Sequence, residues 1–356
     1  KSLSMRNVQA ALMDDRKCVA DAVPEAGTVR YIKTKEMLSI PWLSEYGMEE
    51  QSVQSRLEDT FMMLLKEDEF SSKQRTAFSD TIDMDFDESD IETERKRLLS
   101  PNEMVERPVE ISVSHLVRTF GDFTAVANTS FTVQRGEVFG LLGPNGAGKT
   151  TTFRMLCGLL PVTSGDLRVA GVDVVKSRTA ARSNFGYVAQ KFSLYGNLSV
   201  MENLEFFAGV YGLYGQKKDD RIEAVIKEFR LNDVRDMIAG DLPGGYKQRL
   251  SMAAALMHEP KILFLDEPTS GIDPLTRRNF WRQITSLSKR GTTIIITTHF
   301  MDESEYCDRI MIQDAGKLVV LGTPDEVRRT AGDETCTMDE AFISVILEKR
   351  EQEEDV

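Results

Sequence analysis

The sequence has few cysteines, no long apolar run and a shortage of positive charge. Its four cysteines lack the spacing of a metal site and indicate the reduced thiols of a cytoplasmic protein (Cys18, Cys157, Cys307 and Cys336). No apolar stretch approaches the roughly 20 residues that cross a bilayer, and the first residues lack a signal-peptide layout. Any membrane role is therefore expected to depend on a partner. With 44 Lys and Arg against 57 Asp and Glu, the net charge is −13, so no nucleic-acid partner is expected.

Composition divides the 356 residues into four parts. Residues 1–65 mix short helical and strand-like patterns, as in a small α/β region. Residues 66–108 are dominated by charged residues and serine, which predicts an acidic flexible linker, with a binding tail for a basic partner as the alternative. Residues 109–322 have the pattern of a compact α/β domain, and residues 323–356 predict a C-terminal helical tail.

The α/β domain contains two kinds of strand pattern. Residues 111–118 and 125–133 alternate apolar and polar side chains, as antiparallel strands do. Three later stretches are almost continuously apolar or β-branched, which is typical of buried parallel strands: 137–142, 261–265 and 292–298. Helical patterns over about residues 197–258 interrupt this alternation. The predicted fold class is therefore α/β, with an antiparallel β-subdomain and an inserted α-helical subdomain.

A glycine-rich stretch lies between the first parallel strand and a helical pattern: Gly143-Pro144-Asn145-Gly146-Ala147-Gly148-Lys149-Thr150-Thr151. It matches the P-loop pattern G-x-x-x-x-G-K-[ST]. Backbone N–H groups in such a turn point inward, and the helix N-terminus adds partial positive charge, so the loop favours a phosphate. Lys149 is expected to reach the β- and γ-phosphates, and the Thr150 hydroxyl to bind Mg²⁺. A turn without a ligand is the alternative, which the flanking strand and helix disfavour.

Polar residues follow the predicted parallel strands at their carboxyl ends, where ligands bind in open α/β sheets. Asp266 and Glu267 follow the apolar run at 262–265. Asp266 is expected to hold Mg²⁺, and Glu267 to polarise the attacking water as a general base. His299 follows the strand at 292–298 and is expected to contact the γ-phosphate if the two strands are neighbours. Gln190 follows a short strand pattern, but the residues alone do not distinguish it from a solvated glutamine.

Six motifs occur in the order and approximate spacing of an ABC ATPase cassette, which the chain resembles over about residues 109–322. They are 143–150 (Walker A), Gln190 (Q-loop), 242–246 (signature), Asp266-Glu267 (Walker B), 270–273 (D-loop) and His299 (H-loop). The resemblance implies a P-loop NTPase fold of the ABC type, ATP hydrolysis, and ATP and Mg²⁺ as ligands. It implies that Thr150, Gln190 and Asp266 bind the metal, and that Lys149, Glu267 and His299 are catalytic.

One aromatic position also fits this family. Phe120 resembles the residue that stacks on adenine, an interaction worth about 1 kcal/mol. Two alternatives stay open: Phe123 stacks instead, or Phe120 is simply a buried residue at a strand end.

The signature motif departs from the family's Leu-Ser-Gly-Gly-Gln. Pro243 replaces the serine and Tyr246 the glutamine, whereas Gly244 and Gly245 remain. Proline removes both a hydroxyl and a backbone N–H donor, although a helix predicted from Lys247 still offers its N-terminus. In the family this motif closes on the γ-phosphate held by the opposite cassette. The departure predicts two unequal ATP sites, and the weaker one is completed by residues 243–246.

A closer resemblance is to the second cassette of the YbhF-like group, ATPases of bacterial ABC-2-type exporters that carry two cassettes on one polypeptide. Residues 57–65 also resemble residues 338–346, each with an apolar residue, two acids, a Phe and an apolar run. Residues 1–65 would then be the tail of a preceding cassette, and the chain a fragment. The resemblance implies transmembrane ABC-2 permease subunits and a partner cassette (the preceding one or a second copy) as partners, with the protein in the cytoplasm on the inner face of the cell membrane.

An apolar cluster follows Gln190: Phe192, Leu194, Tyr195 and Leu198. In the family a short coupling helix of the membrane subunit docks here, and filling of the helical subdomain's core is the alternative. Two competing functions are an ABC ATPase that acts on ribosomes or DNA without transport, and a nucleotide-binding regulator. The acidic composition and the single modest insert argue against the first, and Glu267 with His299 argue against the second.

Overall fold

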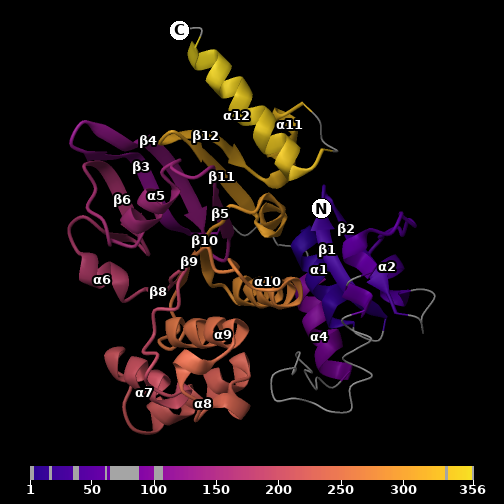
Figure 1. The fold of residues 1–356 in the computed structure, drawn as a ribbon. Coiled ribbons are helices and arrows are strands. Elements are labelled where there is room, and N and C mark those ends of the chain that lie inside the picture. The colour runs from indigo at the N-terminus through magenta and orange to yellow at the C-terminus, as the bar shows by residue number, and fades with distance from the viewer. Residues whose placement is uncertain are drawn as a thin grey trace.

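The computed structural model describes residues 4–15, 18–34, 40–60, 62–64, 88–99, 107–332 and 336–354. They form an α/β body, an inserted group of helices at one end of it, and a small N-terminal region beside it (Figure 1). Within these ranges no helix is both long and apolar enough to cross a bilayer.

A six-stranded sheet with the order β12-β11-β5-β10-β9-β8 forms the centre of the body. Neighbours from β11 to β8 are parallel, and β12 pairs antiparallel with β11. All residues of the three central strands β5, β10 and β9 are buried, which confirms the predicted buried parallel strands. The bounds are β5 Val138–Leu142, β8 Phe185–Val188, β9 Ile262–Asp266, β10 Thr293–Thr297, β11 Arg309–Asp314 and β12 Lys317–Gly322.

A second, antiparallel sheet has the order β4-β3-β6-β7 and confirms the predicted β-subdomain. Buried and exposed residues alternate along much of β4, because successive side chains of a strand point to opposite faces. The bounds are β3 Val109–Phe120, β4 Phe123–Gln134, β6 Ser164–Val169 and β7 Val172–Asp173.

Two apolar clusters cover the opposite faces of the central sheet. Phe139 and Leu141 of β5 belong to the cluster shared with the β-subdomain and helix α5 (Lys149–Leu156). Val138 and Leu142 of the same strand belong to the cluster shared with α10 (Pro274–Lys289) and the helical insert. Because alternate residues of β5 point to opposite faces of the sheet, β5 packs against the β-subdomain on one face and against the helical insert on the other. The same strand leads into the P-loop.

The predicted helical subdomain contains α7 (Val200–Val210), α8 (Gln216–Phe229) and α9 (Gly244–Ala255), with two short 3₁₀ turns between α8 and α9 (η1 Asn232–Val234 and η2 Ala239–Asp241). A small helix, α6 (Arg178–Arg182), precedes β8. Helix α7 begins with a capping box of Ser199 and Glu202. Helix α9 packs so closely on β8 that a Cβ at Gly186 would collide with the Ala255 carbonyl.

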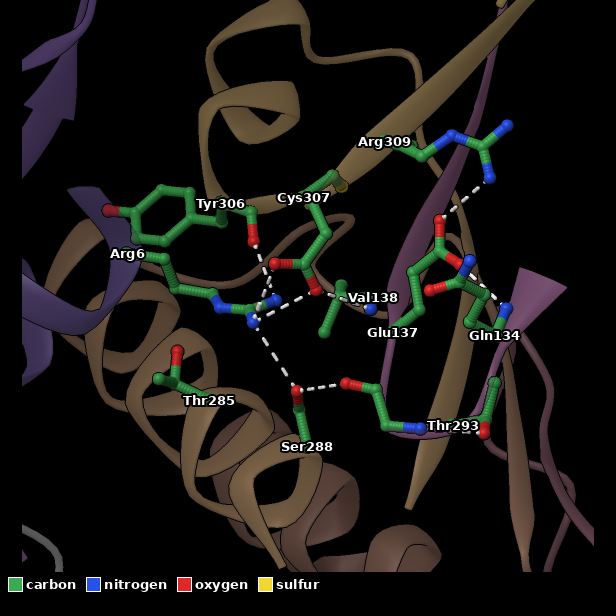
Figure 2. A network of polar contacts seen from close by, with 12 residues as sticks. Arg6, Gln134, Glu137, Val138, Thr285, Ser288, Thr293, Tyr306, Cys307 and Arg309 are labelled. Carbon is green, nitrogen blue, oxygen red and sulfur yellow. Dashed lines mark hydrogen bonds and ion pairs between the residues drawn. The ribbon is translucent and has the colours of Figure 1, made fainter. Parts of the chain in front are cut away.

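The N-terminal region is α1 (Met5–Asp14), the antiparallel hairpin of β1 (Val19–Glu25) and β2 (Thr28–Lys33), and α2 (Pro41–Glu45). It packs beside α10 (Figure 1) through buried ion pairs. Arg278 of α10 pairs with Asp21 at 2.9 Å, and Arg282 pairs with Asp14. Arg6 is bound by residues of the α/β body (Figure 2). Ion pairs and hydrogen bonds of buried arginines thus hold the N-terminal region against the α/β body.

Part of the predicted flexible linker, residues 66–108, is instead a helix. Residues 88–99 form α4, and Leu98 and Leu99 are buried in the same apolar cluster as α1. For these twelve residues the prediction of a flexible linker is wrong. The two apolar side chains at the end of this charged stretch are buried in the core of the N-terminal region, which stabilises the helix. The acidic residues 83–87 and the remainder of that stretch, except 107–108, lie outside the described residues.

The C-terminal residues form α11 (Pro324–Thr330) and α12 (Met338–Glu354), as the sequence predicts. The similar stretch near the start is helical over residues 57–60 and 62–64, while Phe61 lies outside the described residues. Packing differs between the two stretches. Met338 is buried whereas Leu57, its counterpart, is 88% exposed. The similarity therefore concerns sequence and helical conformation but not burial.

Candidate nucleotide-binding site

The P-loop connects β5 to α5 and has the backbone that its glycines permit. Gly143, Gly146 and Gly148 all have positive φ values (146°, 82° and 99°). A Cβ at Gly143 would collide with the Gln313 carbonyl, and one at Gly148 would lie 2.5 Å from the Ala125 carbonyl oxygen. These two glycines are therefore required by close packing of the loop, while Gly146 lies at an open position. The result is a turn at a helix N-terminus, the geometry that binds phosphate.

Lys149 is the first residue of α5, and its side chain folds back over the loop. Its Nζ donates to the carbonyl oxygens of Gly143 at 2.5 Å and Pro144 at 2.9 Å. Burial lowers the pKa of the ammonium, and Glu267 partly offsets this effect. The lysine is thus held at the loop by weak neutral partners, which an anionic ligand would replace favourably.

Four adjacent parallel strands bring the remaining predicted residues to one edge of the sheet. In the order β5-β10-β9-β8 they are followed by the P-loop, His299, Glu267 and Gln190. The register pairs Asp266 with Thr297, so the predicted neighbourhood of those two strands is confirmed. Sequence reasoning could name the residues at each strand end, but only the strand order puts them side by side.

Glu267 is the centre of this group. Its Oε2 accepts a hydrogen bond from Gln190 Nε2 at 2.7 Å and lies 3.3 Å from His299 Nδ1. Its backbone has φ 43°, a left-handed conformation that costs a non-glycine residue about 1–2 kcal/mol. Strain of this kind occurs at functional sites. The structure therefore joins Gln190, Glu267 and His299 into one polar group at the edge of the sheet that carries the P-loop.

Two threonines that the sequence did not single out support these residues. Thr297 Oγ1 donates to Asp266 Oδ1 at 2.8 Å and accepts from the Glu267 backbone N–H at 3.0 Å. Thr152 on α5 is tied by a buried hydrogen bond from Gln313 Nε2 at 3.0 Å. Thr297 looks like any other residue of a β-branched strand, and Thr152 looks like any other helix residue, so the sequence gives no signal for either role.

Comparison with known proteins agrees with this geometry. The family described as "ABC transporter" matches residues 126–270. The linearmycin resistance ATP-binding protein LnrL of Bacillus subtilis is 38% identical over 66% of this chain and 78% of LnrL. The Nod factor export ATP-binding protein I of Burkholderia lata is 41% identical over 60% of this chain and 71% of that protein.

A longer relative covers almost all of the chain. The probable multidrug ABC transporter ATP-binding protein YbhF of Escherichia coli is 46% identical over 92% of this chain. This chain belongs to the ABC transporter ATP-binding proteins. The chain spans only 54% of the length of YbhF. Among solved structures, an ATP-binding subunit of an ABC transporter shows 28% identity and a TM-score of 0.61, covering 66% of this chain and 99% of that one. The predicted fold, a P-loop NTPase of the ABC type, is confirmed, and the cassette is an ATP-binding domain of an ABC-type ATPase.

The residues at the predicted metal position fit Mg²⁺. The described residues contain no group of three His, Cys, Asp or Glu side chains that could hold a metal by themselves. A P-loop cassette does not need one, because Mg²⁺ prefers oxygen ligands and takes most of them from phosphate and water. Thr150 is exposed at the start of α5, and Asp266 ends β9, which is separated by β10 from the strand that leads into the P-loop. The hydroxyl, carboxylate and amide oxygens of Thr150, Asp266 and Gln190 have the chemistry this ion prefers.

The signature helix α9 begins earlier than predicted. It starts at Gly244, not at Lys247, and Pro243 occupies the N-cap position without a side-chain cap. Tyr246 is buried in the core of the helical subdomain, and the Arg249 guanidinium lies 4.9 Å from its ring centroid. The tyrosine at the glutamine position therefore serves packing, while Gly244 is exposed and Gly245 partly exposed.

Phe120 and Phe123 face each other across the turn that joins β3 to β4. Phe120 is 45% exposed and Phe123 is 65% exposed, so the alternative of a buried strand-end Phe120 is wrong. The Arg118 guanidinium lies 4.4 Å from the Phe120 ring centroid. Both aromatic rings are accessible, and the geometry leaves both as candidates for stacking.

The apolar cluster after Gln190 divides into two parts. Phe192 and Leu194 pack against the core of the helical subdomain, as the packing alternative predicts. Tyr195 is 46% exposed and contacts the exposed ring of Phe206 at 4.7 Å between centroids. The buried amide of Asn203 holds this loop by bonding the backbone N–H and carbonyl of Tyr195. The exposed aromatic pair thus joins Tyr195 on this loop, which Asn203 holds in place, to Phe206 on α7.

Proposed function

We propose that this cassette is the ATP-hydrolysing motor of a bacterial ABC-2-type exporter, working with separate transmembrane permease subunits on the inner face of the cell membrane. The observation that carries the proposal is the group of Gln190, Glu267 and His299 at the sheet edge where the P-loop lies. A relative named as a Nod factor export protein supports the direction of transport.

Residue roles follow from the chemistry of each side chain. The P-loop amides of 143–148 and the Lys149 ammonium bind the phosphates of ATP, and Thr150, Thr151 and Gln190 complete the contacts at the mouth of the loop. Glu267 is the general base that takes a proton from the attacking water, and His299 orients Glu267 and contacts the γ-phosphate. Thr150, Gln190 and Asp266 would hold Mg²⁺, which neutralises phosphate charge when it is bound.

A partner cassette would complete each ATP site, and the two sites would be unequal. Gly244 and Gly245 at the start of α9 would offer backbone N–H groups to the ATP held by the partner. Pro243 offers neither hydroxyl nor N–H, so that site would turn over more slowly. Residues 1–65 would be the tail of a preceding cassette, which the β1–β2 hairpin supports because β11 and β12 form a similar hairpin.

The exposed pair of Tyr195 and Phe206 would receive the membrane subunit. Exposed aromatic rings on a helix and on a loop that is held in place are typical of an interaction surface. Docking of a partner there would be coupled to the Q-loop, because Gln190 lies only five residues before Tyr195.

Co-expression with ABC-2 membrane subunits of the same organism tests this proposal. The protein should co-purify with them in detergent, and Tyr195→Ala with Phe206→Ala should abolish co-purification while nucleotide binding is retained. Val175→Ala provides the control, since Val175 is at least as exposed (53% against 46% and 43%) but lies beside the β-subdomain. Co-purification with ribosomes or DNA in place of membrane subunits would contradict the transport function.

A further inference from the structure

A buried carboxylate lies directly behind His299. Glu303 is in the 3₁₀ helix η3 (Met301–Tyr306), is fully buried, and accepts a hydrogen bond from Thr298 Oγ1 at 2.6 Å. Burial raises the pKa of its carboxyl group. Because burying a carboxylate costs free energy, a fully buried glutamate is expected where its hydrogen bond has a role in the protein.

The Thr298 hydroxyl connects the residues on both sides of His299. It donates to Glu303 and accepts from the Phe300 backbone N–H at 3.0 Å. Thr298 and Phe300 are the two neighbours of His299 in the chain. Glu303 therefore fixes the backbone on either side of the imidazole, whose Nδ1 lies 3.3 Å from Glu267.

Helix α10, which begins directly after the D-loop, adds a second support. Arg277 Nε lies 3.8 Å from Glu303 Oε1, and the Arg277 guanidinium lies 4.5 Å from the Phe300 ring centroid. Asp273, the last D-loop residue, caps this helix by accepting from the Thr276 N–H. The segment that follows His299 is thus packed against α10 through Arg277.

The other end of η3 is held by the N-terminal region. Arg6 of α1 is 3% exposed and donates to the Tyr306 carbonyl at 3.2 Å and to both oxygens of Asp308 at 3.0 and 3.1 Å (Figure 2). Asp308 also accepts from the backbone N–H of Val138, the first residue of the strand that carries the P-loop, at 2.9 Å. One guanidinium therefore ties the end of η3 to the start of β5.

We propose that Glu303 is a positioning residue for His299, and that Arg6 holds the same helix in place from the N-terminal region. The proposal rests on the proposed role of His299 in hydrolysis. Glu303 touches no reacting atom. It acts by restricting the backbone around His299, so that the imidazole stays directed at Glu267.

Steady-state ATP hydrolysis by the full chain tests the proposal with paired variants. Glu303→Leu and Thr298→Val each remove one partner of the buried hydrogen bond, and kcat should fall about tenfold with little change in KM. Glu303→Gln and Thr298→Ser retain an acceptor and a hydroxyl, and they should keep most of the activity. Circular dichroism melting of each variant separates loss of fold from loss of position.

A double variant distinguishes positioning from a general structural role. Glu303→Leu should cause no further loss in a His299→Ala background, because it acts only through His299. An equal loss in both backgrounds, or a raised KM with unchanged kcat, would overturn the proposal. If His299→Ala itself left turnover unchanged, the proposed role of His299 would fail and this inference with it. A loss in His299→Ala with full activity in Glu303→Leu would overturn the inference alone.

The contribution of Arg6 has its own comparison. Arg6→Met should lower kcat about threefold, a smaller loss because Arg6 acts at the far end of η3, and Arg6→Lys should recover part of it. Amide hydrogen exchange should become faster over residues 299–308 in Arg6→Met. Arg56→Met removes an exposed ion pair within the N-terminal region and should change neither quantity. Unchanged exchange and turnover in Arg6→Met would refute this part.

Discussion

The two faces that this cassette would present to ATP differ in how fully they are equipped. The P-loop face has a glycine turn, a lysine and a triad of Gln190, Glu267 and His299 with contacts of 2.7 and 3.3 Å. The signature face has an uncapped proline, two accessible glycines and a tyrosine that is buried in the core. The P-loop face therefore has the side chains that ATP hydrolysis would need, whereas the signature face offers only the N-terminus of a helix.

This difference indicates that a cassette can keep one half of a composite site while the other half weakens. The P-loop face depends on strand order and close packing, so most substitutions there would also disturb the sheet. The signature face lies at one helix end, where proline is tolerated because the first helical N–H groups have no partner within the helix. If the cassette pairs as proposed, this unequal constraint on the two faces would make the two ATP sites unequal.

Loss of the general base should produce the largest effect. Glu267→Gln keeps the shape and the contact with Gln190 but cannot take a proton, so ATP hydrolysis should fall about 100-fold or more while ATP binding is retained. Phosphate release and equilibrium binding of a fluorescent ATP analogue measure the two properties. Glu259→Gln, at an exposed position, is the control. The proposed asymmetry would be wrong if the corresponding change in a partner cassette caused an equal loss.

Loss of the Lys149 ammonium should weaken the binding of ATP itself. Lys149→Ala removes an ammonium that is held over the loop, and ATP affinity should fall about 10- to 100-fold, the value of one or two charge-assisted hydrogen bonds. Lys191→Ala removes an exposed lysine beside Gln190 and should have no such effect. Titration calorimetry gives both dissociation constants, and equal affinities would rule out the assigned role of Lys149.

Restoring the signature serine should narrow the difference between the faces. Pro243→Ser returns a hydroxyl and an N–H to the N-cap of α9, and turnover in the assembled protein should rise by up to about fivefold, the value of one net hydrogen bond. Pro243→Ala restores the N–H only and separates the two contributions. Unchanged turnover in both variants would show that the signature face does not limit hydrolysis.

The smallest predicted effect concerns adenine. Phe120→Ala should weaken ATP binding about fivefold, which corresponds to about 1 kcal/mol of stacking. Phe123→Ala should have little effect. Comparison of ATP with GTP in both variants decides between the rings, since the reverse order of losses would assign stacking to Phe123.

Much of the P-loop face could be predicted from the sequence because its motifs are local. The turn at 143–148 and the acids after β9 are short patterns with one physical reading each. The role of Thr297, the path from Arg6 to Asp308 and the burial of Leu98 and Leu99 depend on contacts between residues far apart in sequence. Periodicity carries no information about such contacts, which is why α4 was predicted as part of a linker and α9 to begin at Lys247.

A crystal structure with Mg²⁺ and a non-hydrolysable ATP analogue tests the central claim most directly. The phosphates should lie against the backbone amides of residues 143–148, and Lys149 Nζ should move from the Gly143 carbonyl to a phosphate oxygen. Glu267 and His299 should lie at the γ-phosphate. A loop without nucleotide at saturating concentration, or Glu267 and His299 directed away from the loop, would contradict it.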